Sequence, residues 1–266
     1  MSNGGSAGAV AERRGTVSVQ GCDVSLLRFG RGTPTLVLHG FEPFNDTSPF
    51  LAALAEHVEV IAPDHPGFGN SSTPPWLDNI DDVAFFYREF VATLGFERVN
   101  VIGHGLGGWI ALELAMRTPF AQSLVLIDSA GVVVPGIDGI DTFLCTAEQL
   151  HAAGFVDPAV AEATAPPSSE RTVELQLKNG LCSALLAWKP RFHNPHLRKW
   201  IHQINVPTLV LWGAQDRIFP QAYGKELARV IRDARLKVIE NCGYAAPVER
   251  PAECAAAVTA FLEEIA

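Results

Sequence analysis

The sequence lacks the features of a nucleic-acid-binding or membrane-spanning protein. It contains 20 basic and 29 acidic residues, for a formal net charge of -9, and it has no run of basic side chains. This charge argues against nucleic acid or an anionic membrane surface as a partner. No stretch approaches the roughly 18 to 20 uncharged apolar residues that a spanning helix needs. Residues 2–14 contain no apolar signal-peptide core, so we expect a cytoplasmic protein.

The cysteine pattern offers neither a disulfide framework nor a zinc site. The chain has five cysteines, an odd number, scattered from Cys22 to Cys254 without any C-x-x-C pair. We expect them to be small buried hydrophobic side chains. Nothing in the sequence indicates a metal or an organic cofactor, and we expect none.

The apolar patterns of the 266 residues predict one α/β domain with a mostly parallel sheet covered by helices on both faces. Residues 1–15 are expected to be disordered, and a hairpin at the sheet edge is expected at 16–20 and 23–29. Further strands are predicted at 35–39, 58–62, 123–128, 206–213 and 235–240, and helices at 51–57, 80–94, 220–231 and 251–265. Short helical runs at 146–153, 157–163 and 172–186 predict a helical insertion at 135–200. The core domain is then formed by residues 16–134 and 201–266.

Residues 98–117 form the most informative stretch of the chain. A β-branched run that includes Val99 and Ile102 predicts a buried strand. It ends at a glycine cluster, Gly103-His104-Gly105-Leu106-Gly107-Gly108, and the apolar spacing that follows predicts a helix. So tight a turn needs small residues because the backbones of the strand, turn and helix come into contact.

This strand, turn and helix resemble the nucleophile elbow of the α/β-hydrolase family, G-x-S-x-G, with Gly105 in place of the serine. The literal G-x-S-x-G at residues 4–8 has no strand before it and no helix after it, so we interpret it as a chance match. The resemblance extends over residues 16–266. It implies an α/β-hydrolase fold like that of lid-bearing meta-cleavage-product hydrolases and esterases, with 135–200 as the lid.

The resemblance also locates the other two members of a catalytic triad. Residues 206–216 read V-P-T-L-V-L-W-G-A-Q-D, which matches the family pattern for the acid and implies that role for Asp216. The family histidine lies in G-H-A-P-H-x-E-x-P, and the register set by Gly243 and Glu249 puts Tyr244 in its place. Glycine offers no nucleophile, and tyrosine, with a pKa near ~10, is a poor base at pH 7. We therefore expect a degenerate triad that does not support covalent hydrolysis.

Other parts of the site are implied to persist. The backbone N–H groups of Phe41 and Leu106 would form an oxyanion hole, and Asp216 would accept a hydrogen bond from the Tyr244 hydroxyl. Loss of the serine side chain is expected to enlarge the floor of the pocket. His39 and His104 are expected to pack structurally, and Asp128 to cap a helix or a loop. The residues expected to contact a ligand are Gly40, Glu42, Phe44, Trp109, Val132, Phe143, Trp188 and Phe192.

These replacements leave three functions open. The first, which we favour, is a non-hydrolytic enzyme of cyclase, isomerase or lyase type that acts on an apolar, carbonyl-bearing small molecule through the oxyanion hole and Tyr244. The second is a non-catalytic pseudoenzyme or receptor that binds a ligand or a partner. The third is an ester or C–C bond hydrolase seen as a variant. A homodimer is compatible with each of them, and fold does not decide among them.

Overall fold

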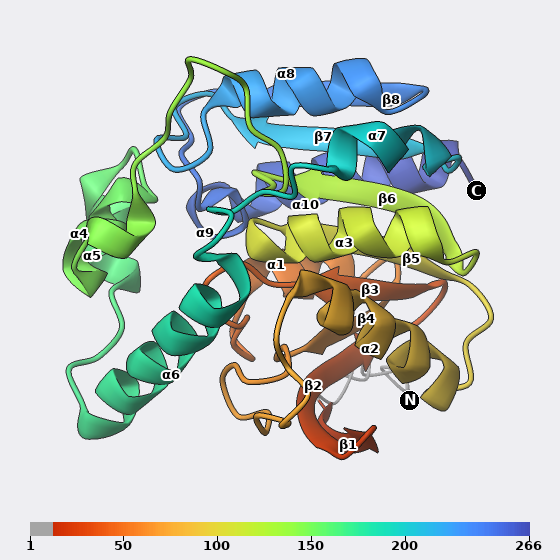
Figure 1. Ribbon diagram of the computed structural model, residues 1–266, viewed down its shortest axis with the longest axis horizontal. Coiled ribbons are helices and arrows are strands. Elements are labelled where there is room, and N and C mark those ends of the chain that lie inside the picture. The colour runs from red at the N-terminus through yellow and green to blue at the C-terminus, as the bar shows by residue number, and fades with distance from the viewer. Residues whose placement is uncertain (1–12) are drawn as a thin grey trace, which may run out of the picture.

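The computed structural model describes residues 13–266, which are organised around one eight-stranded sheet between two layers of helices (Figure 1). The strands are arranged in the order β1–β2–β4–β3–β5–β6–β7–β8. β1 and β2 form an antiparallel hairpin and β2 is antiparallel to β4, whereas the other neighbours are parallel. The strands are β1 (Arg13–Val19), β2 (Cys22–Gly30), β3 (Pro34–Leu38), β4 (Glu59–Pro63), β5 (Val99–His104), β6 (Ala121–Ile127), β7 (Thr208–Gly213) and β8 (Ala234–Ile239).

The predicted edge hairpin and mostly parallel sheet are confirmed. One boundary differs, because β1 begins at Arg13 and residues 13–15 belong to a strand rather than to the predicted disordered tail. They pair with residues 26–28 of β2, and this supplies their backbone with hydrogen bonds. The rest of that tail, including the chance motif at 4–8, lies outside the described residues.

Helices cover both faces of the sheet (Figure 1). Apolar side chains of α2, α3 and α8 form a core on one face, which we call the α3-side core. Side chains of α1 and α10 form the α10-side core on the other face. These helices are α1 (Pro49–Leu54), α2 (Ile80–Thr93), α3 (Leu106–Arg117), α8 (Gln221–Val230) and α10 (Pro251–Glu264).

The strands contribute to both cores by alternation. In β5, Val99 and Val101 belong to the α3-side core, whereas Ile102 belongs to the α10-side core. This follows from the period of two in a strand, and it explains why a central strand needs a continuous apolar run. Such double burial removes large apolar areas from water and holds the strand ends in fixed positions.

The segment between β6 and β7 is mostly helical. The three predicted helical runs are observed as α4 (Ala147–Ala153), α5 (Pro158–Thr164) and α6 (Glu170–Ala187). Short elements that the sequence did not predict are η1 (Thr142–Leu144), α7 (Leu197–Trp200) and η2 (Ile201–Gln203), together with α9 (Ala246–Glu249) after β8. Figure 1 shows α4, α5 and α6 beside one end of the sheet. The role of residues 135–200 as a lid stays a prediction.

Two features of the described residues bear on partners. Between residues 13 and 266, every helix is too short or too polar to cross a bilayer. The same residues hold no group of three or more His, Cys, Asp or Glu side chains arranged to bind a metal ion.

Candidate active site

The candidate site lies where the parallel strands end, the usual place for binding residues in an open α/β sheet. The loops that leave these strands carry the residues singled out in the sequence. They are Gly40 and Phe41 after β3, Gly105 after β5, Asp128 after β6, Asp216 after β7 and Tyr244 after β8.

The turn between β5 and α3 has the geometry that its glycines predict. Gly105 has a φ of 53°, in the left-handed region, and is the residue that precedes the first turn of α3. Its N–H donates to the Ile127 carbonyl oxygen at 3.0 Å, and the Gly107 N–H donates to the His39 carbonyl oxygen at 2.9 Å. A side chain on Gly103 would collide with the Gly107 backbone. The turn therefore has the backbone geometry expected of the elbow, with Gly105 at the position where the resemblance implies a serine.

Tyr244 fills the space that a serine side chain would occupy. A Cβ atom placed on Gly105 would overlap the Tyr244 hydroxyl oxygen and lie 2.9 Å from Cζ and 3.0 Å from Cε2 of the same ring. A Cβ atom on Gly40 would overlap that hydroxyl oxygen as well. Tyr244 is 6% exposed. The expected enlargement of the pocket floor is wrong, because the phenol takes up the volume that the missing side chain leaves.

The Tyr244 hydroxyl has no hydrogen-bond partner of regular geometry in the described structure. The expected bond to Asp216 is therefore wrong: the ring places the hydroxyl oxygen against the elbow at Gly105. Burial raises the pKa of Tyr244 well above its usual value, and the Asp216 carboxyl raises it further. The backbone amide of Phe41 opposes this shift in the pKa, which places one predicted oxyanion-hole donor beside the phenol. At neutral pH the group is a neutral donor without an acceptor.

Asp216 and Asp128 form a buried carboxyl pair. One oxygen of Asp216 accepts from the backbone N–H of Ile218 at 2.7 Å and of Phe219 at 3.0 Å. One oxygen of Asp128 accepts from the Gly213 N–H at 2.8 Å, which confirms its role as a backbone cap. The second oxygen of each carboxyl has no partner in the described structure. Burial raises the pKa of both, and the Asp216 carboxyl raises that of Asp128 further.

The two histidines near the elbow hold backbone, as expected. His104 Nε2 bonds to the Tyr244 carbonyl oxygen at 2.9 Å and so fixes the backbone beneath the phenol. His39 Nδ1 bonds to the Gly40 carbonyl oxygen at 2.9 Å, and its Nε2 accepts from the His65 N–H at 2.9 Å. Burial lowers the pKa of His104 to about 4, so the imidazole is neutral at pH 7.

Aromatic rings close the site above Tyr244. We call Phe41, Phe143, Trp188, Phe192, Phe219 and Tyr244 the aromatic cluster. Ring centroids are 5.4 Å apart for Phe41 and Tyr244, and 5.4 Å apart for Phe41 and Phe192. Phe143 stacks on Phe192 at 4.9 Å. Predicted ligand-contacting residues thus pack on one another rather than around an open space.

Residues 35–257 match the family model described as the Alpha/beta hydrolase family. The chain belongs to this family. A 2-hydroxymuconate semialdehyde hydrolase of Pseudomonas sp. (strain CF600) is 28% identical over 88% of this chain and 88% of that protein. The 2-hydroxy-6-oxo-6-(2'-aminophenyl)hexa-2,4-dienoic acid hydrolase of Metapseudomonas resinovorans is 25% identical over 92% of this chain and 89% of that protein.

Solved structures agree with this assignment of the α/β hydrolase family. A serine hydrolase involved in carbazole degradation (CarC enzyme) has a TM-score of 0.77 and 25% identity, covering 96% of this chain and 99% of that chain. A bacterial membrane phospholipase A has a TM-score of 0.74 and 28% identity, covering 96% of this chain and 86% of that chain. The relatives are named as hydrolases, and the α/β-hydrolase fold is shown.

Three further residues predicted to contact a ligand pack against the cores of this α/β hydrolase family member, and their contact with a ligand stays a prediction. Phe44 packs on Phe50 in the α10-side core, with centroids 6.0 Å apart. Trp109 is 4% exposed on α3, where its Nε1 donates to a Glu113 oxygen at 3.2 Å. The Phe44 ring packs its loop against the α10-side core, and the Trp109 ring packs α3 into the α3-side core. Val132 is buried in the α3-side core, and its contact with a ligand stays a prediction.

Two further residues, Glu42 and Phe219, belong to the surroundings of Tyr244. The Glu42 carboxylate accepts from the side-chain amide of Asn179 at 2.6 Å. Although the residue as a whole is exposed, its carboxyl group is surrounded by protein, and this burial raises its pKa to about 7. Phe219 was not predicted, although its position three residues after Asp216 marks it as part of the acid loop. Its ring lies 5.7 Å from that of Tyr244.

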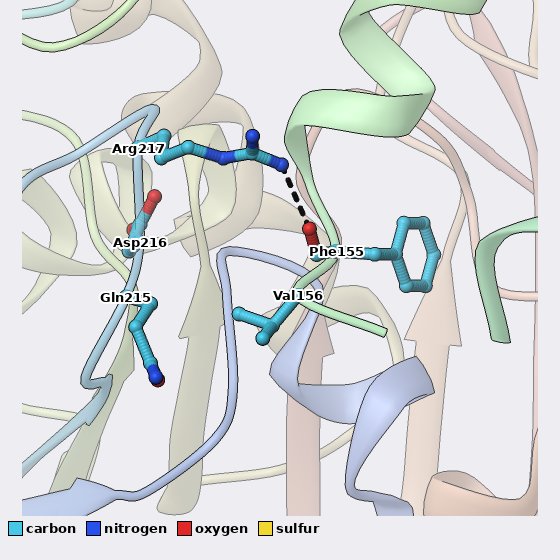
Figure 2. Close-up of a pocket in the computed structure, with 5 residues that line it drawn as sticks. All are labelled: Phe155, Val156, Gln215, Asp216 and Arg217. Atoms are coloured by element: carbon cyan, nitrogen blue, oxygen red, sulfur yellow. Dashed lines mark hydrogen bonds between the residues drawn. The ribbon is translucent and has the colours of Figure 1, made fainter. Parts of the chain in front are cut away.

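Two surface hollows lie outside the elbow. The first, of about 430 Å³, is lined by Phe155, Val156, Gln215, Asp216 and Arg217 (Figure 2). Arg217 crosses it and donates to the Phe155 carbonyl oxygen at 2.8 Å (Figure 2). The second, of about 420 Å³, lies by residues 205–207 and 232–235. Neither Gly105 nor Tyr244 lines either hollow.

Proposed function

We propose that this α/β hydrolase family member is a pseudoenzyme that does not hydrolyse through a serine acyl-enzyme and acts by binding a partner. The observation that carries the proposal is the overlap between a side chain at Gly105 and the Tyr244 hydroxyl oxygen. A serine nucleophile and this tyrosine exclude each other sterically. The two replacements are therefore mutually adapted within one packed site.

The remaining polar groups support this proposal. Serine acyl transfer needs a hydroxyl, a base that titrates near pH 7, and an acid that orients the base. Asp216 retains the position of the acid, but its second oxygen has no partner. An imidazole in place of Tyr244 would have a ring N–H for such an acceptor. The Tyr244 hydroxyl lies at Gly105 and makes no hydrogen bond to Asp216. No proton path therefore joins residue 105, residue 244 and Asp216.

The aromatic cluster favours a binding surface over a reaction chamber. A small-molecule site needs a concave space that encloses most of the ligand. Here Phe41 and Phe219 both pack on the Tyr244 ring, with centroids 5.4 and 5.7 Å away. A ligand could reach the elbow only if several of these contacts separated. The hydrolase scaffold then serves to hold surface elements in place.

A set of four proteins tests the proposal: wild type, Gly105→Ser, Tyr244→His, and the double variant. Each is treated with a fluorophosphonate probe and assayed with p-nitrophenyl esters. We expect no labelling of wild type and no ester hydrolysis above a heat-denatured control. The double variant alone should label, because it restores nucleophile and base beside Asp216. Labelling of wild type, or its turnover of ester at rates like those of the double variant, would contradict the proposal.

One observation favours a second candidate, the non-hydrolytic enzyme. The Tyr244 hydroxyl is buried without an acceptor, and such unpaired groups often have a functional reason. A carbonyl oxygen of an apolar ligand could accept from it and from the Phe41 amide if the aromatic cluster opened. Thermal-shift screening with aryl ketones and lactones tests this, using Tyr244→Phe as the matched control. A ligand that raises the melting temperature of wild type but not of Tyr244→Phe, and is converted to product, would establish the second candidate.

A further inference from the structure

Helix α6 exposes a row of large apolar side chains. Val173, Leu177, Leu181 and Leu185 are 52, 64, 72 and 51% exposed, and Trp188, just after the helix, is 50% exposed. We call these residues the α6 outer face. Their spacing of three or four residues places them along one side of the helix. A contiguous apolar patch of this kind on a soluble domain marks an interaction site.

Hydrogen bonds hold α6 to the loop that contains Gly69 and Ser71. Lys178 Nζ donates to the carbonyl oxygens of Gly69 at 2.9 Å and Ser71 at 2.6 Å. The Asn179 side chain accepts from the Gly69 N–H at 2.9 Å and donates to Glu42 at 2.6 Å. Rolling the helix to bury its outer face would break all of these bonds. The outer face is therefore held towards the outside and is not a face that the same chain covers.

No contact within the described residues of a single chain explains why residue 180 is a glycine. It lies in the middle of α6, where glycine is less favourable than alanine. A Cβ atom placed on it would meet nothing within 4 Å, so packing in this chain does not require glycine. Its position beside Leu177 and Leu181 leaves room for another backbone to approach the helix closely.

The two ends of α6 carry opposite charges. Glu170 lies at its N-terminus beside an ion pair between Arg171 and Glu174, and Lys189 and Arg191 follow its C-terminus. Within the described part of the chain, Glu170 and Lys189 have no ion-pair partner within 4 Å, whereas Arg191 pairs with Asp141. A second copy of α6 packed in the antiparallel direction would bring the unpaired Glu170 of each helix towards the unpaired Lys189 of the other.

We propose that the α6 outer face binds the same face of a second copy, antiparallel, about a two-fold axis near Leu181. Such a contact is self-complementary: Leu181 lies at the axis, Leu177 meets Leu185, and Val173 meets Trp188. A membrane-binding helix would instead have an excess of basic side chains on its polar face, whereas α6 has two acidic residues, Glu170 and Glu174, and two basic ones, Arg171 and Lys178. One helix about 27 Å long makes a small interface, so the dimer should dissociate in the micromolar range.

Sedimentation velocity over about 1 to 100 µM tests the dimer. Wild type should pass from monomer to dimer, and Leu181→Glu should weaken self-association at least about tenfold. Phe85→Glu is the matched control, because Phe85 is an apolar residue of α2 that is 51% exposed and lies outside the face. This control should associate like wild type. Circular dichroism verifies that each variant is folded.

A charge exchange tests the antiparallel arrangement. Glu170→Lys alone and Lys189→Glu alone each place like charges at both ends of the interface and should weaken association. An equimolar mixture of the two single variants, and the double variant by itself, should recover it. In a parallel contact residue 170 would face residue 170 and residue 189 would face residue 189, so neither single variant would weaken association. That outcome, or a double variant that stays as weak as the single ones, would overturn the proposed arrangement.

Gly180→Leu separates the dimer from the stability of the monomer. It should leave the melting temperature of dilute protein unchanged or higher, because leucine favours a helix, yet weaken the dimer by holding the helices apart. A wild type that stays monomeric throughout, or a dimer unaffected by Leu181→Glu, would refute the proposal. Binding of monomeric wild type to phosphatidylcholine–phosphatidylglycerol vesicles that Leu181→Glu abolishes would assign the face to lipid instead. None of these outcomes depends on the catalytic state of residue 105.

Discussion

Gly105 and Tyr244 are separated widely in sequence but share one small volume. Residue 105 could be assigned from the spacing of its neighbouring glycines, and residue 244 from its register with Gly243 and Glu249. Their contact could not be predicted, because it depends on how far a phenol reaches from one loop into another. The sequence therefore indicated the loss of a nucleophile and a base, but led us to expect an enlarged pocket where the structure has a filled one.

This contact predicts a strong coupling between the two positions. Gly105→Ser alone should lower the free energy of unfolding by about 1 to 3 kcal/mol, because its Cβ overlaps the Tyr244 hydroxyl. Adding Tyr244→His removes the overlap, so the double variant should be more stable than the sum of the single effects by about 0.5 to 3 kcal/mol. Urea unfolding of the four proteins measures this coupling. If the changes in the free energy of unfolding of the two single variants simply added, the Tyr244 side chain would be shown to move away from residue 105 with little loss of stability.

A single hydroxyl can also be tested at this site. Tyr244→Phe removes a buried oxygen that has no hydrogen-bond partner and keeps the ring contacts of the aromatic cluster. The variant should be as stable as wild type or more stable by up to about 1 to 3 kcal/mol. Thermal unfolding provides the measurement, with Tyr223→Phe as control, because the Tyr223 hydroxyl donates to the Ile137 carbonyl oxygen at 2.8 Å. A loss of stability in Tyr244→Phe that matches the control would reveal a partner for the hydroxyl.

Among the elements, long periodic segments were predictable and short ones were not. β5, α2 and α10 follow apolar patterns strong enough to locate within a few residues. α9 contains residues 246–249 and α7 only 197–200. A single turn of helix has no period to detect, and its bonds come from neighbouring loops. Packing of Phe44 and Trp109 could not be predicted for a related reason, since an aromatic residue near a site has the same sequence signature in a core as in a pocket.

The loop that bears Tyr244 is held by one carboxylate from α9. Glu249 accepts from the backbone N–H groups of Val156, Asp157 and Gly243, each at 2.7 Å. It thus joins the loop between α4 and α5 to the loop after β8. The α9 turn, which the sequence did not predict, is the element that places this carboxylate between the two loops.

Glu249→Gln should weaken that junction. An amide group cannot accept through its nitrogen, so at least one backbone N–H loses its partner, at a cost of about 1 to 3 kcal/mol. Hydrogen exchange should increase at residues 154–157 and 243–244 and stay unchanged in β5. Glu253→Gln, on the exposed side of α10, is the control and should exchange like wild type. If exchange in both loops of Glu249→Gln stayed the same as in wild type, other contacts would be shown to hold them.

Across the whole molecule, buried histidines and buried carboxyls change the stability of the fold in opposite directions as the pH rises. Burial lowers the pKa of His65 and His104 to about 4, so stability is lost as pH falls below about 6.5, where the unfolded chain binds protons. Burial raises the pKa of Asp128 and Asp216, so stability is lost as pH rises through the range where the unfolded carboxyls have already ionised. Above pH 7 the histidine contribution is constant, whereas the carboxyl pair still titrates. So do the Glu42 carboxyl, whose pKa is about 7, and the thiols of Cys242 and Cys254, whose pKa burial raises.

Stability should therefore decline between pH 7 and pH 9, and Asp128→Asn should reduce that decline. The variant keeps an oxygen for the Gly213 N–H, removes one ionisation, and supplies a permanent donor near Asp216. Its stability relative to wild type should rise with pH and reach about 1 to 3 kcal/mol at pH 9. Urea unfolding at a series of pH values gives the difference, with Asp138→Asn at an exposed position as control. A difference that is the same at pH 5 and pH 9 would mean that the pair does not hold its proton in the folded protein.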